Sequence, residues 1–146
     1  MSSANRIRLA QLRETPLSLT ECEELVADAR HGAVVSFGGV VRNHDGGRDV
    51  ASLSYEAHPN AEAALLAVAE GIAARFPSVV VAIAHRVGAL VIGDLALVCA
   101  VGSAHRAEGF AACQALIDET KAAVPIWKLQ LFTDGTSEWV GADVQL

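Results

Sequence analysis

Residues 120–128 of this chain read TKAAVPIWK, and they mark the point where a helix gives way to a strand. Pro125 cannot continue a helix, because its ring would clash with the carbonyl group of Lys121, four positions earlier. Val124 precedes the proline and is driven toward extended backbone. The stretch therefore predicts a helix that ends near Ala122 or Ala123 and a strand that follows it.

Outward from this stretch, helical and extended patterns follow one another in mixed order. Ser18 and Glu21 have capping-box spacing, which predicts a helix that runs to about Arg30. Two further helices are expected over about 58–76 and 105–123, with Ser103 as the N-cap of the last. Strands are expected over 6–10, 32–41, 50–57, 79–83, 95–101, 126–132 and 139–140. The pattern predicts an α+β fold in a single domain over 1–146, with about three helices and a mixed, mostly antiparallel sheet.

The bulk composition excludes several classes of protein. The formal net charge is −6, so a broad nucleic-acid or anionic-membrane surface is not expected. No run of about 18 apolar residues is present, so no membrane span is expected. The three cysteines form no CxxC pair, and the N-terminus has no apolar leader, which favours a reducing, cytoplasmic compartment.

The chain holds only two lysines, Lys121 and Lys128, beside nine arginines. A lysine ammonium group is a compact charge whose pKa responds to its surroundings, whereas a guanidinium is always charged. The plain alternative is that Lys121 complements a helix dipole and Lys128 is a solvated strand residue. The two ammonium groups can converge only if the chain folds back sharply at Pro125.

Two other segments carry candidate binding groups. Residues 102–106, GSAHR, join a strand to a helix, and free N–H groups at such a turn suit a phosphate. Arg106 can add a bidentate clamp, and His105 can move a proton, although a capped helix start with these residues is common without function. Arg42 stands where a buried strand meets a glycine-rich loop. The histidines lack metal-ligand spacing, so no metal site is predicted.

Taken together, these segments resemble the large, catalytic subunit of molybdopterin synthase along nearly the whole chain. The segments that carry the resemblance are 37–44 (FGGVVRNH), 53–57 (LSYEA), 85–88 (HRVG), 103–106 (SAHR) and 121–128 (KAAVPIWK). The resemblance implies a fold of the α/β-hammerhead type. It also implies a sulfurtransferase that converts cyclic pyranopterin monophosphate (precursor Z) into molybdopterin, in molybdenum cofactor biosynthesis.

The resemblance further implies a partner and an assembly. Two sulfurs arrive as a thiocarboxylate on the C-terminal Gly-Gly of a small ubiquitin-like subunit, and they form the dithiolene of the product. The family assembles as a large-subunit homodimer with one small subunit at each end, which makes a heterotetramer. Because the reacting sulfur is imported, no cofactor and no reactive cysteine of this chain is expected.

Residue by residue, the resemblance implies that Lys121 is the catalytic lysine and Lys128 its companion. The implied substrate-binding residues are Val40, Val41, Arg42, His105, Arg106, Lys121, Lys128, Leu129 and Gln130. Lys121 is expected to transfer a proton or to polarise a thioester-like intermediate, and His105 is the second candidate for the proton transfer. Val40 departs from relatives that often carry a basic residue there. The chain also ends soon after Trp139, where some relatives carry a basic residue near the equivalent of Asp143.

Two other functions stay open at this point. The same fold could bind a phosphorylated metabolite or a ubiquitin-like tail without turnover, or it could serve as an oligomeric scaffold. Formation of dithiolene product separates the enzyme from the binding module. Capture of a small partner that ends in Gly-Gly counts against the scaffold.

Overall fold

The computed structural model describes residues 3–141 of the chain. Within these residues, four helices and nine strands follow one another in the order α1 (Ser3–Arg6), β1 (Ile7–Arg13), α2 (Leu19–Val26), β2 (Ala33–Val40), β3 (His44–Asp45), β4 (Arg48–Ala57), α3 (Ala61–Arg75), β5 (Val80–Arg86), β6 (Gly88–Val91), β7 (Leu95–Ser103), α4 (Arg106–Ala123), β8 (Ile126–Phe132) and β9 (Ser137–Val140). The three longer helices and the α+β class were predicted from the sequence. None of these helices is both long and apolar enough to cross a membrane.

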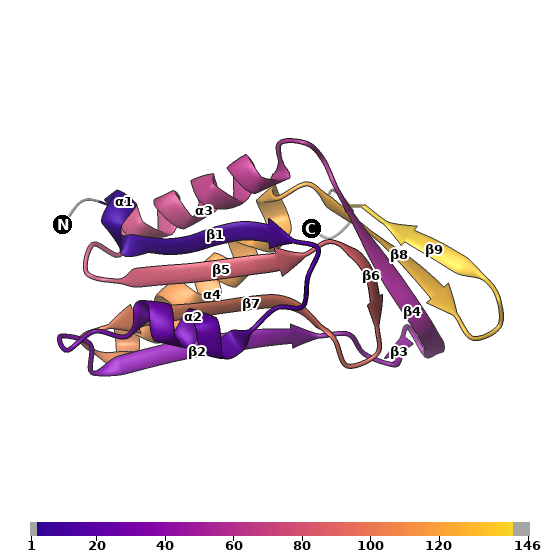
Figure 1. The fold of residues 1–146 in the computed structure, drawn as a ribbon, viewed down its shortest axis with the longest axis horizontal. Coiled ribbons are helices and arrows are strands. Elements are labelled where there is room, and N and C mark those ends of the chain that lie inside the picture. Colours follow the sequence, from indigo (N-terminus) through magenta and orange to yellow (C-terminus); the bar gives the residue numbers. More distant parts are fainter. Residues whose placement is uncertain (1–2, 142–146) are drawn as a thin grey trace.

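The strands form two sheets that meet at an angle (Figure 1). The first has the order β1-β5-β7-β2, in which only the β1–β5 pair is parallel. The second has the order β3-β4-β8-β9, and β6 pairs with the β3 side of β4. The sheets are therefore mixed and mostly antiparallel, as predicted.

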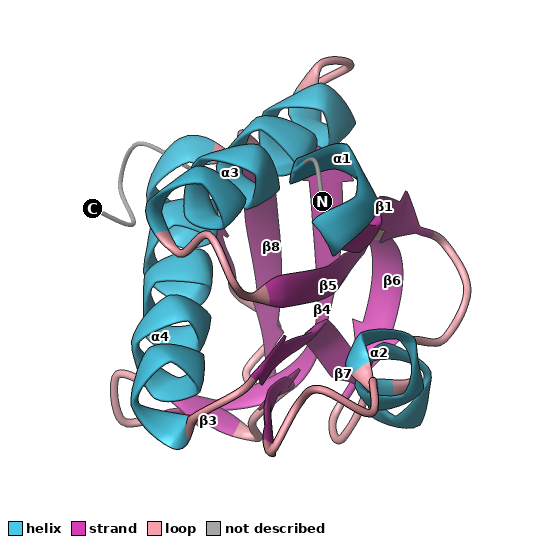
Figure 2. Ribbon diagram, turned by 90° about the vertical axis from the view of Figure 1, so that its left-hand side faces the viewer, coloured by secondary structure: helices cyan, strands magenta, loops and turns pink. Residues whose placement is uncertain are grey.

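Helices cover both faces of the first sheet. Figure 2 shows α3 and α4 together on one side and α2 on the other. The strands between them are buried on both faces, which explains their continuous apolar sequences. Along β5, Val81 and Ile83 face α3 and α4, whereas Val80 and Ala82 face α2.

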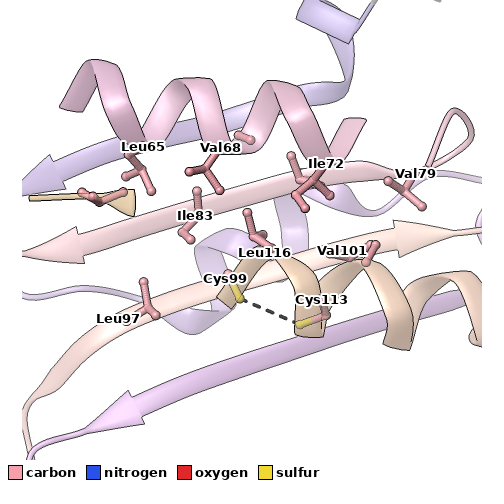
Figure 3. Packing of buried hydrophobic residues seen from close by; sticks show 14 of the residues in the cluster. Leu65, Val68, Ile72, Val79, Ile83, Leu97, Cys99, Val101, Cys113 and Leu116 are labelled. Atoms are coloured by element: carbon pink, nitrogen blue, oxygen red, sulfur yellow. Dashed lines mark hydrogen bonds between the residues drawn. The ribbon is translucent and has the colours of Figure 1, made fainter. Parts of the chain in front are cut away.

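The larger core lies between this sheet and the α3–α4 pair. Leu65 and Ile72 of α3 and Leu116 of α4 are fully buried against Ile83, and Figure 3 shows them facing one another. A second cluster on the opposite face includes Cys22 and Val26 of α2. These clusters hold α4 and β5 in place, and both elements contribute side chains to the site described below.

Two expected helix boundaries were wrong. Ser18 does cap α2, because its Oγ accepts the Glu21 N–H at 3.1 Å, but the helix ends at Val26 and not near Arg30. The predicted N-cap of α4, Ser103, belongs to β7 and pairs with Ala33 of β2. Its Oγ donates to the carbonyl of His105 at 2.7 Å, and His105 occupies the N-cap position without a side-chain cap bond.

The sequence pattern also missed the strand β6. Gly88 and Gly93 lie between the two predicted strands 79–83 and 95–101, and both have a φ of 92° that favours glycine. Between them β6 turns away from the first sheet and pairs with residues 52–55 of β4. This connection joins the two sheets at the place where the site forms.

Candidate active site

An open cavity of about 540 Å³ lies where the two sheets meet. It is lined by Phe37, Gly39, Val40, Arg42, Tyr55, His85, Ala96, Leu97, Thr120, Lys121, Val124, Ile126 and Lys128. These residues come from β2, β4, β5, β7, β8 and the C-terminal turn of α4, with Arg42 just after β2. A cavity of this size suits a small-molecule ligand.

The turn at Pro125 brings both lysines to this cavity. α4 ends at Ala123, and Val124 caps it with a backbone N–H to the carbonyl of Thr120 at 3.1 Å. The carbonyl of Pro125 then accepts the backbone N–H of His58 at 3.0 Å, which fixes the start of β8 beside the end of β4. Lys121 therefore lies in the last turn of α4, and Lys128 lies on the strand that follows. The helix-to-strand change was predicted correctly, and the convergence of the two lysines was an open alternative.

Lys128 is the more enclosed of the two ammonium groups. It is partly buried and lies opposite Tyr55 in the β4–β8 ladder. Burial lowers its pKa, and the charges of Arg42 and Lys121 lower it further, whereas Asp45 acts in the opposite direction. A lysine in this setting gives up its proton more readily than an exposed one.

Asp45 links the cationic groups to the sheet. Its Oδ2 accepts a hydrogen bond from the Gln130 amide at 2.8 Å, and its Oδ1 lies 3.4 Å from the Arg42 guanidinium. The Gln130 bond, followed by the charges of Lys128 and Arg42, lowers the pKa of Asp45. Gln130 is 2% exposed, so this predicted binding residue acts on Asp45 and does not line the cavity.

Three other predicted pocket residues divide between the cavity and the protein interior. Val40 is 53% exposed and lines the cavity. Val41 is buried with Leu53 in a small apolar cluster beneath β6. Leu129 pairs with Trp139 across the β8–β9 ladder and is not a lining residue.

His105 and Arg106 lie at the other end of α4, away from the cavity of the same chain. Arg106 and Lys121 are fifteen positions apart on this helix, which is about 22 Å at a rise of about 1.5 Å per residue. Both His105 and Arg106 are exposed. The positively charged or basic residues of the implied binding set, Arg42, His105, Arg106, Lys121 and Lys128, therefore do not form one pocket within one chain, and the groups that the fold brings together are Arg42, Lys121 and Lys128. The tail position Asp143 lies outside the described residues.

Sequence reasoning did not assign two side chains that line the cavity, Tyr55 and His85. Their rings meet edge to face, with centroids 4.9 Å apart and planes at 87°. Burial raises the pKa of Tyr55, and it lowers the pKa of His85. Both residues lie within segments that carried the family resemblance, and that was the available signal.

Thr120 presents an unusual polar group at the same place. It is 3% exposed and lines the cavity, and its Oγ1 has no hydrogen-bond partner among the described residues. Buried hydroxyl groups are normally bonded, so this one is available to a ligand or a water molecule.

None of the three cysteines is among the residues that line this cavity. Cys22, Cys99 and Cys113 are free and buried, and burial raises the pKa of Cys22 to about 11. Sγ of Cys99 lies 3.9 Å from Sγ of Cys113 in the core (Figure 3). Within residues 3–141 no three His, Cys, Asp or Glu side chains are grouped so that they could hold a metal ion.

The chain is similar to known proteins in sequence and in fold. The model of the family described as MoaE protein matches residues 12–123. The chain is 43% identical over 127 residues to the molybdopterin synthase catalytic subunit of a Nostoc species, covering 86% of this chain and 77% of that protein. It is 40% identical over 132 residues to molybdopterin synthase catalytic subunit 1 of Mycobacterium tuberculosis, covering 90% and 89%. The crystal structure of molybdopterin synthase from Staphylococcus aureus superposes with a TM-score of 0.83 at 35% identity, covering 89% of this chain and 95% of that one.

Proposed function

This chain belongs to the MoaE protein family, and from that membership we propose that it is the catalytic subunit of a molybdopterin synthase. The reaction is the transfer of two sulfurs to cyclic pyranopterin monophosphate, which creates the dithiolene of molybdopterin. The sulfur donor is the C-terminal thiocarboxylate of a small ubiquitin-like subunit. The enzyme is a sulfurtransferase that needs no cofactor of its own.

The observation that carries the proposal is the convergence of Arg42, Lys121 and Lys128 on one cavity, in a chain whose net charge is −6. The substrate carries a phosphate, and a local group of cations against an acidic background selects for such an anion. Arg42 can hold the phosphate with two parallel hydrogen bonds. The lysines, which come from α4 and β8, are then available to the rest of the ligand.

Lys121 is the proposed catalytic residue and Lys128 its companion. Sulfur transfer passes through a thioester-like intermediate, and negative charge develops on oxygen as that intermediate forms and breaks. Fixed ammonium groups stabilise such charge in the transition state. The pKa of Lys128 is lowered by burial, so this group gives up its proton more readily than an exposed lysine, which suits it to proton transfer.

The positions of His105 and Arg106 favour a dimer in which each cavity is completed by the second copy. A two-fold axis that brings Arg106 of the partner to Lys121 must pass beside the middle of α4. An apolar groove of about 360 Å³ lies there, between β2 and α4, and it is lined in part by Phe110, Cys113 and Ile117. Phe110 is 62% exposed, which suits a residue that a second copy covers.

We also infer an assembly and a cellular compartment for the chain. One domain over 1–146 forms the central dimer, and one small subunit binds at each end. The three unpaired thiols are consistent with a reducing, cytoplasmic compartment.

The test is reconstitution with the thiocarboxylated small subunit and precursor Z. The parent chain is expected to form molybdopterin, and Lys121→Ala is expected to lose nearly all of that activity. Arg30→Ala is a matched control, because Arg30 pairs with Asp28 on the exposed surface outside the cavity. If the parent chain binds precursor Z saturably but forms no product, the chain is a binding module and the proposed enzymatic function is wrong.

A further inference from the structure

His85 is the one imidazole group that lines the cavity, among the residues that the structure describes. It stands near the end of β5, and Tyr55 of β4 holds its ring edge to face. The cations assigned above account for phosphate binding and charge stabilisation. The role of the His85 ring is not explained by these cations.

The hydrogen bonds of His85 fix which ring nitrogen carries the proton. Nδ1 lies 2.7 Å from the backbone carbonyl of Arg86. A carbonyl oxygen only accepts, so Nδ1 must be the donor. In the neutral ring Nε2 is then unprotonated, and it has no hydrogen-bond partner within residues 3–141.

The surroundings of the ring favour the neutral form. Burial lowers the pKa of His85, the Arg86 carbonyl acts in the opposite direction, and the charge of Lys121 lowers the pKa further. Lys128 of β8 adds a second ammonium group to the same cavity, and Tyr55 contributes a neutral phenol. The ring therefore faces cations from α4 and β8.

The charged side chains next to His85 in the strand register and in the sequence, Glu62 and Arg86, are engaged elsewhere. On β1, Leu12 is the register partner of His85, and its N–H is bonded at 2.9 Å to Glu62 of α3. On β7 the partner is Leu97, which is apolar. The side chain of Arg86 donates to the carbonyl of Glu14 at 3.2 Å. No carboxylate in the described part of the chain forms an ion pair with His85 that would keep it protonated.

Nε2 of His85 is consequently distinct from the other polar groups of the cavity. Arg42, Lys121 and Lys128 only donate hydrogen bonds when charged, and the hydroxyls of Tyr55 and Thr120 can donate or accept. A neutral His85 with its proton on Nδ1 offers an acceptor alone. A pterin ring system presents N–H and O–H groups, which require acceptors when they are buried.

We propose that His85 is a further substrate-binding residue, whose unprotonated Nε2 accepts a hydrogen bond from an N–H or O–H group of the pterin. This assignment rests on the proposed function, because it takes the ligand to be cyclic pyranopterin monophosphate. It divides the recognition of the substrate in two. The cations hold the phosphate, and His85 recognises the ring system.

The direct test compares His85→Phe with His85→Gln in the reconstituted reaction. Phe keeps an aromatic ring against Tyr55 and removes the acceptor, so kcat/KM is expected to fall about tenfold or more, because a buried donor of the substrate loses its partner. Gln returns an amide oxygen at a similar distance, and it is expected to recover part of that loss. His58→Phe is the matched control, since His58 is exposed and lies outside the cavity.

The pH profile separates binding from a merely structural role. In the parent, kcat/KM is expected to fall on the acid side as His85 becomes protonated below its ordinary pKa of 6.5 and Nε2 turns into a donor. This acid limb is expected to disappear in both His85→Phe and His85→Gln. A structural residue would change the level of the profile and leave its shape unchanged.

Each outcome decides one question. A parent that forms molybdopterin, together with a His85→Phe variant that matches it in kcat/KM and pH profile, overturns the role of His85 and leaves the proposed function in place. If the parent forms no product, the proposed function fails. Calorimetric binding of precursor Z to the parent and to His85→Phe then still decides whether Nε2 contacts the ligand. If the Phe variant does not fold, the profile of His85→Gln carries the same comparison.

Discussion

Lys121, before Pro125 in the chain, and Lys128, after it, line the same cavity, and the charge of Lys121 lowers the pKa of Lys128. Burial lowers the pKa of Lys128 first, and nearby positive charges lower it further. Because the chain has only two lysines, this coupling can be measured without interference from other lysine side chains.

Removal of the charge at Lys121 should raise the pKa of Lys128. Lys121→Ala takes away a neighbouring cation that disfavours the charged form, whereas Lys121→Arg keeps it. The measurement is an NMR titration of protein labelled with ¹³C-lysine, which shows two side-chain signals in the parent and one in each variant. A pKa of Lys128 that is equal in the Ala and Arg variants would show that the two groups are not coupled.

Asp45→Asn should move the same pKa in the opposite direction. The carboxylate of Asp45 favours the charged form of Lys128, so its neutral isostere is expected to lower the pKa of Lys128 below that of the parent. The same titration measures it. Asp49→Asn is the control, because Asp49 lies nearby on β4 but does not contribute to the pKa of Lys128. An unchanged pKa of Lys128 in Asp45→Asn would mean that Asp45 serves only to hold Gln130.

The stability of the fold should decrease as the pH falls below about 6.5, and His85 should cause part of that decrease. Its folded pKa is lowered, so the unfolded chain binds more protons in this range and the free energy of unfolding falls with falling pH. The expected effect is about 1.4 kcal/mol for each unit by which the pKa is lowered. Urea unfolding at a series of pH values measures it, and His85→Phe should flatten the curve.

Glu21→Gln provides the comparison for that experiment. Glu21 pairs with Arg13 at 2.6 Å, and this bond lowers its pKa from 4.5. Its contribution to stability is present above 4.5 and is lost only below that value. The Gln variant should therefore keep the slope between about pH 6.5 and 5. A parent curve that is flat in this range would refute the contribution of His85.

Variants at the two ends of α4 should complement each other in mixed dimers. Lys121→Ala and Arg106→Ala are each expected to be nearly inactive alone if a cavity needs Lys121 from one copy and Arg106 from the other. Random mixing leaves one intact cavity in each heterodimer, or about a quarter of all cavities. Co-expression with two different tags and a molybdopterin assay measures the recovery. Mixed dimers without recovery would place both residues in one cavity or outside it.

The end of α4 at Pro125 and the start of α2 at Ser18 could be predicted because their causes lie within a few residues. The proline ring ends α4, Ser18 caps α2, and both follow from backbone chemistry that neighbours in the sequence dictate. Ser103 failed as an N-cap for the opposite reason. Its place is decided by pairing with Ala33, seventy positions away, which extends β7 beyond the expected strand end.

The content of the site needed the tertiary structure. Nothing near His85 in the sequence indicates that Tyr55 packs on its ring or that Lys121 lies near it. The separation of Arg106 from Lys121, in contrast, follows from the helix between them, and that helix was predicted from the sequence. A rise of about 1.5 Å per residue along it is enough to exclude a pocket that both side chains share within one chain.

The cavity is lined by residues spread between Phe37 and Lys128, so no single segment of the chain can form it alone. β8 closes the site by pairing with β4, and it follows every other lining strand in the chain. A nascent chain that lacks β8 has neither Lys128 nor the surface on which it stands. A chain in which β8 has not yet paired with β4 therefore has no complete binding site, so the site forms only together with the second sheet.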